Sequence, residues 1–171
     1  VMKRAEWHTF QVLTKRSARL AEVAPDLPWP RNVWMGVSVE NQRWTCRVDD
    51  LRRVPAAVRF LSCEPLLGPI NLDPWIAWPP PTIAWVIAGG ESGPKARPMH
   101  PDWARSLRGQ CASFDVPFFF KQWGEWLGPR QKTFDRNGMP LENCTDVSIR
   151  LSRRTNGRLL DGREWNEYPH V

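Results

Sequence analysis

The chain has 171 residues, enough for one domain with a substantial core and too few for two ordinary domains joined by a linker. Its 24 Lys and Arg against 18 Asp and Glu give a formal net charge of +6, which suits an anionic ligand but is also common on solvated surfaces. A hydrophobic fraction of 42% with 25% charged residues is typical of globular proteins, and no apolar run approaches the roughly 20 residues of a membrane-spanning helix. The first ten residues include Lys3, Arg4, Glu6 and His8 rather than an apolar signal region, so we expect a cytoplasmic protein without membrane association.

Much of the chain alternates between β-rich runs and segments with helical spacing. Strands are predicted over residues 9–14, 33–39, 58–61, 83–88 and 118–121. Helices are predicted to begin near Ser17, Gln42 and Pro101. Because strands that alternate with helices form βαβ units, this pattern predicts an α/β protein with a mainly parallel sheet of about five strands.

Two other regions have a different character. The segment between Glu64 and Pro81 is rich in proline and tryptophan and has no regular period, which predicts an irregular crossover. After the fifth predicted strand, the pairs 137–138 (Asn-Gly) and 161–162 (Asp-Gly) are signals for two-residue hairpin turns. We therefore expect residues 1–126 to form the main domain and residues 127–171 to form an antiparallel hairpin appendage packed on it.

Polar or glycine residues follow the predicted strands, where a binding site is expected. In parallel α/β proteins the carboxyl ends of the strands meet at one edge, and the loops there build the site. The candidate site residues are Ser38, Glu40, Ser62, Glu64, Gly89, Gly90, Glu91, Lys121 and Trp123. We expect the three glutamates and Lys121 to converge on one concavity, with Trp123 as one of its walls.

The three glutamates are open to two interpretations. Carboxylates can bind a hard metal, act as acid or base, or hold the hydroxyl and amino groups of a cofactor. They can equally form buried ion pairs with Lys15, Arg16 and Lys121 that close this edge of the sheet. The glycines at 89 and 90 would let a ligand approach the backbone, although neither a dinucleotide fingerprint nor a phosphate-loop motif is present.

The cysteines and histidines do not suggest a metal site. Cys46, Cys63, Cys111 and Cys144 are scattered without a CxxC pair, so we expect this chain to bind neither zinc nor an iron–sulfur cluster by itself. The three histidines are far apart along the chain. The residues around Ser92 and Cys63 match no nucleophile motif, so the sequence identifies no catalytic residue.

The carboxyl-terminal region suggests an alternative function. Basic residues mixed with tryptophan suit phosphate contacts combined with base stacking. The residues concerned are Arg150, Arg153, Arg154, Arg158 and Arg163, together with Trp126 and Trp165. A non-catalytic module that binds nucleic acid or a partner protein is therefore the competing hypothesis, and a solvated basic face around the hairpins is the simpler explanation of the same residues.

Seven blocks of sequence, in order, resemble a known family. They are VLTKR at 12–16, NVWMGVSVEN at 32–41, VRFLSCEPLLGPI at 58–70, WVIAGGESG at 85–93, RPMHPDW at 97–103, PFFFKQWGEW at 117–126 and GRLLDGREW at 157–165. The chain resembles an uncharacterised phage and bacterial family of radical-SAM-like proteins, some of which accompany a three-Cys-motif partner protein. The resemblance extends from about residue 7 to about residue 168.

This resemblance implies a partial (β/α) TIM-type barrel. It implies that a full-length relative binds S-adenosylmethionine and a [4Fe–4S] cluster for radical chemistry on an unknown substrate. The cluster cysteines would lie upstream of these residues, so we expect the present chain to be inactive alone. Glu91 is similar to the end of the glycine-rich motif that touches adenine, although the spacing is one residue shorter, and Ser38, Glu40, Ser62 and Glu64 resemble positions that hold the ribose or the amino and carboxylate groups.

Overall fold

The computed structural model describes residues 1–77, 82–134 and 137–170. Its centre is a five-stranded parallel sheet in the order β1-β2-β3-β4-β5, so that each strand pairs with the next one along the chain. The strands are β1 (Phe10–Thr14), β2 (Val33–Ser38), β3 (Val58–Cys63), β4 (Trp85–Gly89) and β5 (Phe118–Gln122). All five predicted strands and their parallel arrangement are confirmed. The end of the predicted crossover, residues 78–81, lies outside the described residues.

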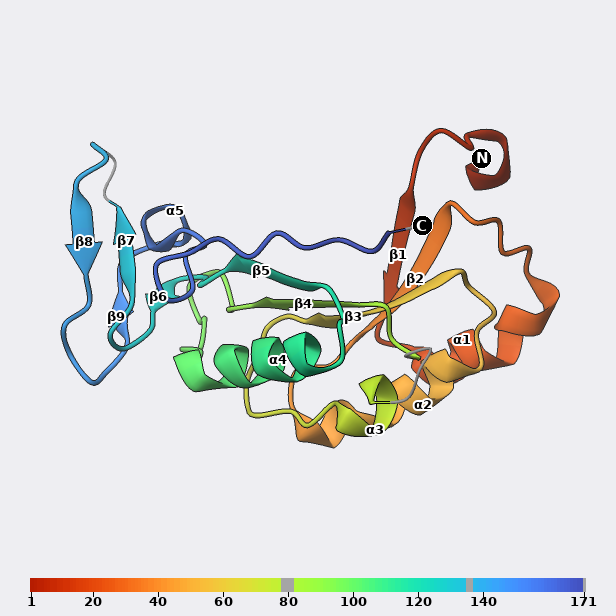
Figure 1. Cartoon of the computed structure of the whole chain (residues 1–171), viewed down its shortest axis with the longest axis horizontal. Coiled ribbons are helices and arrows are strands. Elements are labelled where there is room, and N and C mark those ends of the chain that lie inside the picture. The colour runs from red at the N-terminus through yellow and green to blue at the C-terminus, as the bar shows by residue number, and fades with distance from the viewer. Residues whose placement is uncertain (78–81, 135–136, 171) are drawn as a thin grey trace.

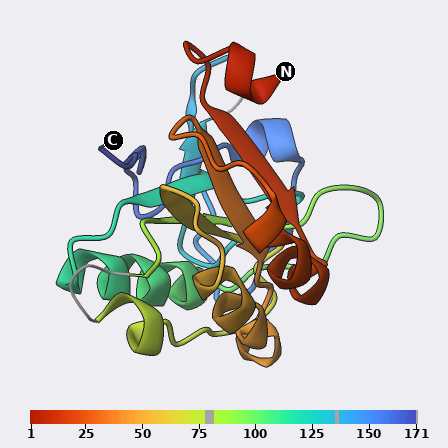
Figure 2. The same ribbon diagram turned by 90° about the vertical axis from the view of Figure 1, so that its right-hand side faces the viewer.

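Helices cover one face of this strongly twisted sheet, as Figures 1 and 2 show. They are α1 (Ser17–Val23), α2 (Cys46–Arg52), the short α3 (Asp73–Ile76) and α4 (Pro101–Ser113), with 3-10 turns at Met2–Arg4, Ala24–Asp26 and Gln42–Trp44. The three predicted helix starts are confirmed, whereas the single turn of α3 was not predicted because its segment has no helical period. None of the helices in the described part of the chain has the length and hydropathy needed to cross a bilayer.

Side chains that alternate along the strands divide the core between the two faces of the sheet. On the helix-covered face, residues such as Val37, Leu61 and Phe120 are fully buried against the helices. The opposite face, called here the inner face, carries a smaller aromatic cluster that includes Phe60 and Trp85. The Phe60 ring lies so close to Gly36 that a Cβ there would be 2.5 Å from the ring. The inner face is therefore aromatic toward the amino ends of the strands.

The predicted antiparallel appendage follows β5. Strands β7 (Lys132–Phe134) and β8 (Pro140–Glu142) form a hairpin, and β6 (Trp126–Leu127) pairs antiparallel with β9 (Ile149–Arg150), which precedes α5 (Arg153–Asn156). The second hairpin signal is confirmed as a two-residue turn, because Leu160 and Arg163 exchange two backbone hydrogen bonds around Asp161 and Gly162. At the first signal, the pairing of Phe134 with Pro140 leaves five residues between the strands, of which 135–136 lie outside the described residues. Asp161 and Gly162 have φ values of 56° and 75°, the left-handed conformation that a tight hairpin turn requires.

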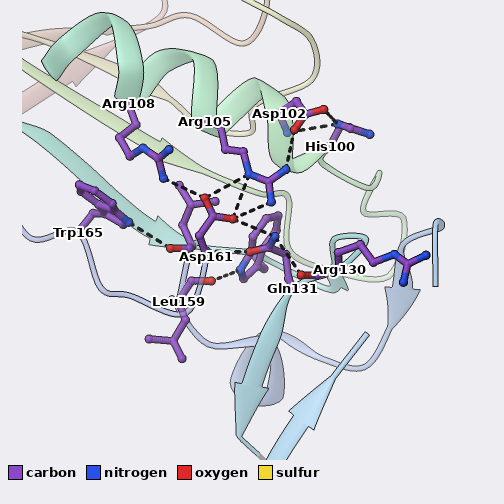
Figure 3. Close-up of polar contacts among 11 residues, drawn as sticks. His100, Asp102, Arg105, Arg108, Arg130, Gln131, Leu159, Asp161 and Trp165 are labelled. Atoms are coloured by element: carbon purple, nitrogen blue, oxygen red, sulfur yellow. Dashed lines mark hydrogen bonds and ion pairs between the residues drawn. The ribbon is translucent and has the colours of Figure 1, made fainter. Parts of the chain in front are cut away.

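Asp161 fastens this turn to helix α4 (Figure 3). Its carboxylate accepts hydrogen bonds from Arg105 at 2.7 Å and Arg108 at 2.9 Å, and its backbone N–H donates to Gln131 Oε1 at 3.0 Å. Burial by itself would raise the pKa of Asp161, but hydrogen bonds to its carboxylate from Arg105, from Arg108 and from Gln131 Nε2 at 3.3 Å lower it to about 2. The turn is thus held by an ionised carboxylate between two cations of one helix.

The last residues of the chain run along the outer edge of β5. Phe120 N donates to Trp165 O, and Glu167 N donates to Phe118 O, in the pattern of a short antiparallel strand. Tyr168 then places its ring 5.4 Å from that of Trp85 on the inner face. One edge of the sheet is therefore covered, whereas β1 at the other edge pairs only with β2 among the residues described.

Candidate functional site

Two serines and a glutamate form a polar row on the inner face at the carboxyl edge. The β2–β3 register pairs Ser38 with Ser62, so both side chains lie on the same face as the aromatic cluster. Glu64, two residues beyond Ser62, continues on this face and accepts a hydrogen bond from the Ser62 hydroxyl at 3.1 Å. The sequence forms this row because small hydroxyl side chains replace the aromatic residues near the ends of β2 and β3.

Lys121 completes the row from β5. The β4–β5 register shifts between Ala88 and Gly89, which leaves Lys121 as an extra residue between the partners of those two positions. Its ammonium group lies 3.3 Å from the Glu64 carboxylate. The Lys121 side chain is 57% exposed and that of Glu64 is 17% exposed, so the carboxylate is the more fixed member of this pair.

The carboxylate of Glu40 is more deeply buried than that of Glu64. It is 8% exposed and pairs with Arg47 at 3.0 Å and also with Lys15. Arg47 is 11% exposed, donates to Ser38 O at 2.7 Å and stacks 4.1 Å from the centre of the Trp44 ring. Because both charges of the Glu40–Arg47 pair are buried, loss of either one would leave the other without a partner.

Glu91 forms the third ion pair. Arg97 donates to both carboxylate oxygens, at 2.8 Å and 2.7 Å, and its backbone N–H donates to the same group at 2.8 Å. These hydrogen bonds lower the pKa of Glu91 to about 2, and the charge of Lys15 adds to the shift. Glu91 is therefore ionised throughout the physiological range.

The structure brings the three glutamates to one edge of the sheet, but each has its own cation. Burial raises the pKa of the Cys63 thiol well above its usual range, and Cys111, Glu64 and Glu40 add electrostatic contributions in the same direction. Of the cations considered from the sequence, Lys15 and Lys121 take part in these pairs, whereas Arg16 makes no ion pair in the described part of the chain. Arg47 and Arg97 take part without having been predicted.

The network is not closed to solvent. The three carboxylates are between 8% and 24% exposed, whereas Lys15, Lys121 and Arg97 are between 57% and 61% exposed. The edge therefore has largely buried carboxylates beneath three more exposed cations, and a ligand that approaches from solvent meets the cations first.

The two glycines after β4 have a different role from the one expected. A Cβ on Gly90 would lie 1.8 Å from the carbonyl oxygen of Trp123, and one on Gly89 would lie 2.8 Å from Oε1 of Glu64. The space that these glycines leave is thus filled by the protein itself and not by an open cradle for a ligand. The expectation that Trp123 forms a wall of the site is wrong for its indole, which is 1% exposed and donates to Leu159 O at 2.8 Å.

The loop after β4 is tied to the appendage. Trp126 Nε1 donates to Ala96 O at 2.7 Å, and Arg150 donates to Pro94 O at 2.9 Å while its guanidinium lies 5.7 Å from the Trp126 ring centre. Glu125 N donates to Glu91 O at 3.0 Å. Sequence reasoning missed these contacts because they join residues that are far apart in the chain and carry no local motif.

Some of the arginines of the nucleic-acid-binding hypothesis already make contacts within this chain. Arg150 is used as just described, Arg158 lies 5.0 Å from the Phe119 ring centre, and Arg163 lies 4.2 Å from that of Trp165. Arg153 and Arg154 are exposed on α5. Three of the five predicted basic residues therefore contact aromatic rings of this chain.

The comparisons with known proteins identify a family. A family model described as "Protein of unknown function (DUF5131)" matches residues 1–169. The chain belongs to this family. Searches among curated proteins and among solved structures give no match for this DUF5131 protein. Within the described residues, no three His, Cys, Asp or Glu side chains are grouped as a metal site would need.

Proposed function

We propose that this chain forms the S-adenosylmethionine side of a radical-SAM-like protein whose [4Fe–4S] cluster is bound by cysteines outside these 171 residues. The observation that carries the proposal is the row formed by Ser38, Ser62, Glu64 and Lys121 on the inner face, at the carboxyl edge of a parallel sheet with consecutive strand order. This order, with helices on one face only, supports a partial (β/α) barrel, in which consecutive parallel strands lie side by side with the helices outside.

The donor set of this row fits part of the proposed cofactor. S-adenosylmethionine has an ammonium and a carboxylate at one end, and Glu64 and Lys121 offer the complementary charges at 3.3 Å from each other. Ser38 and Ser62 are buried, at 3% and 2% exposure, so they would form the floor of the row, and a ligand would contact mainly Glu64 and Lys121. The glycines at 89 and 90 do not add an open cradle, because protein groups fill the space beside them.

In this proposal the residues of the chain bind and orient. Glu64 would accept the ligand ammonium while Lys121 moves to its carboxylate, a displacement that the 57% exposure of the lysine permits. Glu40 and Arg47 would hold the end of β2 in place through their buried pair. When bound, the cofactor and cluster together would supply reductive cleavage of S-adenosylmethionine and radical chemistry on a substrate.

The test uses the gene product together with its upstream region. Anaerobic iron–sulfur reconstitution should give a cluster whose absorption and electron paramagnetic resonance spectra change when S-adenosylmethionine is added. Glu64→Gln should weaken S-adenosylmethionine binding without loss of the cluster, and Arg154→Gln, exposed on α5, is the matched control. The absence of an in-frame cysteine triplet upstream, or an unchanged cluster spectrum with the ligand, would overturn the proposal.

Partner and nucleic-acid binding remain separate proposals. A three-Cys-motif protein encoded nearby is the partner to test by co-purification. The nucleic-acid alternative rests on Arg153 and Arg154, because the other three arginines contact rings of the same chain. A gel-retardation assay over a range of salt concentrations separates the two functions, since phosphate contacts give a steep loss of affinity with salt.

A further inference from the structure

Positive charge is concentrated at the carboxyl edge of the sheet. The loops that follow the strands there, with the end of β5, hold Lys15, Arg16, Arg43, Lys95, Arg97 and Lys121 against Glu40, Glu64, Glu91 and Glu125. The described loops at the amino edge, between helices and strands, hold Arg31 and Arg53 against Asp26 and Asp115. The amino edge is thus balanced in charge, and the excess of cations lies at the edge that carries the candidate site.

Two of these cations have no anionic partner in the described part of the chain. Arg43 follows β2 and Lys95 follows β4, and both are exposed. The Arg43 guanidinium lies 5.3 Å from the centre of the Trp44 ring, and no described residue accepts a hydrogen bond from it. The donors of both side chains are therefore available to an anion from solution.

Arg97 supplies a third set of donors. It binds the Glu91 carboxylate through Nε at 2.8 Å and Nη2 at 2.7 Å, so Nη1 has no partner among the described residues. The hydrogen bond with Glu91 raises the pKa of Arg97, and the charge of Glu40 adds to that shift. Arg97 is thus within electrostatic range of the pair of Glu40 with Lys15, and these cations belong to one charged region.

The spread of these cations favours a chain of phosphates over a single anion. Lys15 follows β1 and Arg97 follows β4, so their points of attachment are three inter-strand spacings, about 14 Å, apart along the sheet. One phosphate group can contact only part of such a region, whereas a nucleic-acid strand carries a phosphate about every 3.4 Å of its helix axis. Arginine and lysine contacts to phosphates also supply most of the affinity in nucleic-acid binding.

We propose that the carboxyl edge takes a nucleic-acid strand as its substrate and holds the phosphates with Arg43, Lys95 and Arg97. This inference rests on the proposed function, because it names the substrate class of the same site. The three cations follow β2 and β4, which have neighbouring strands on both sides, so the inference does not depend on the unpaired edge of β1. It also differs from the alternative that uses Arg153 and Arg154, which lie on α5.

The test measures binding of fluorescently labelled single-stranded DNA and RNA to the 171-residue chain by fluorescence anisotropy, over a range of salt concentrations. Saturable binding that weakens steeply with salt is expected. Arg43→Gln with Lys95→Gln removes two cations without breaking an ion pair, and should weaken binding about tenfold or more and lower the salt slope by about two. Arg153→Gln with Arg154→Gln removes the same charge from α5 and is the matched control. Circular dichroism checks that both variants are folded.

Three outcomes would overturn the inference. One is no binding of either oligonucleotide at low salt. Another is an equal or larger loss of affinity in the α5 variant, which would assign the binding to the appendage. The third is equal competition by polyglutamate or by a nucleoside monophosphate at the same concentration of charged groups, which would show that the edge does not recognise a strand. The assay contains neither S-adenosylmethionine nor a cluster, so its failure is separate from a failure of the cofactor proposal.

Discussion

Glu64 and Gly89 are packed so closely that a methyl group on Gly89 would lie 2.8 Å from Oε1 of Glu64. The contact involves the far end of a flexible side chain, which can move, whereas the neighbouring Gly90 faces the backbone of Trp123. A flexible side chain therefore limits the space beside Gly89, and a backbone group limits the space beside Gly90. The same substitution at the two positions should change the free energy of unfolding by different amounts.

We expect Gly89→Ala to change the free energy of unfolding by about 1 kcal/mol or less, because Glu64 can turn away from the new methyl group. Gly90→Ala should destabilise the fold by about 3 kcal/mol or more, because a backbone carbonyl 1.8 Å from the new atom cannot move without displacing the chain after β5. Urea denaturation measures both changes. The control is Gly109→Ala on the exposed side of α4, expected to stabilise by about 0.5–1 kcal/mol. Equal effects at 89 and 90 would contradict the packing described.

The side chain of Asp161 should contribute far more to the free energy of unfolding than that of an exposed aspartate. Asp161→Asn keeps the left-handed turn accessible but removes the charge between Arg105 and Arg108, so a loss of about 1–3 kcal/mol is expected. Asp146→Asn is the matched control, because Asp146 is 85% exposed in its pair with Arg130 and should contribute about 0–1 kcal/mol. Thermal unfolding of the two variants measures both changes. Similar melting temperatures would show that Arg105 and Arg108 do not hold the turn through Asp161.

Stability should fall as the solution becomes acidic. The pKa of Glu91 is lowered from its ordinary 4.5 to about 2, chiefly by Arg97, and that of Asp161 from 3.8 to about 2. A carboxylate whose folded pKa is depressed contributes stability that is complete above its ordinary pKa and is lost as the pH falls through the folded value. The loss should therefore occur between about pH 4.5 and pH 2. Glu91→Gln should flatten this part of the stability curve, and an unchanged slope would show that the pair with Arg97 does not form in solution.

The four thiols should divide into two reactive and two protected ones. Cys46 and Cys144 are exposed, whereas Cys63 and Cys111 are buried, and burial raises the pKa of Cys111 to about 12. A disulfide reagent that absorbs on reaction should therefore modify two thiols rapidly in the folded protein and the other two only after unfolding. Cys46→Ser with Cys144→Ser should remove the rapid phase, and a remaining rapid phase would place one of the buried thiols at the surface.

Local patterns were sufficient to predict the sheet. The apolar runs before Thr14, Ser38 and Gly89 are short and lie between helical segments, so both the strands and their parallel order follow from periodicity. The turn at Asp161 and Gly162 was predictable because its geometry demands those residue types. The strands and this turn both depend on residues that are close together in the sequence, so the sequence of one chain is enough to predict them.

The cations of the site were less predictable. Arg47 and Arg97 reach Glu40 and Glu91 from a helix and a loop whose positions depend on tertiary packing. The burial of Trp123 likewise follows from contacts with residues near Leu159, far along the chain. The edge covered by the carboxyl-terminal segment could not be assigned either, because the backbone pairing of Trp165 with Phe120 needs no particular side chain.

The pairing of the last residues with β5 also limits how far the sheet can grow. A sheet with two open edges can add copies of itself without end, which is the route to fibres. Here the β5 edge is occupied by the chain's own backbone, so it cannot pair with another copy. Removal of residues 165–170 would expose β5 as an unpaired edge, and this segment therefore protects the sheet against edge-to-edge association.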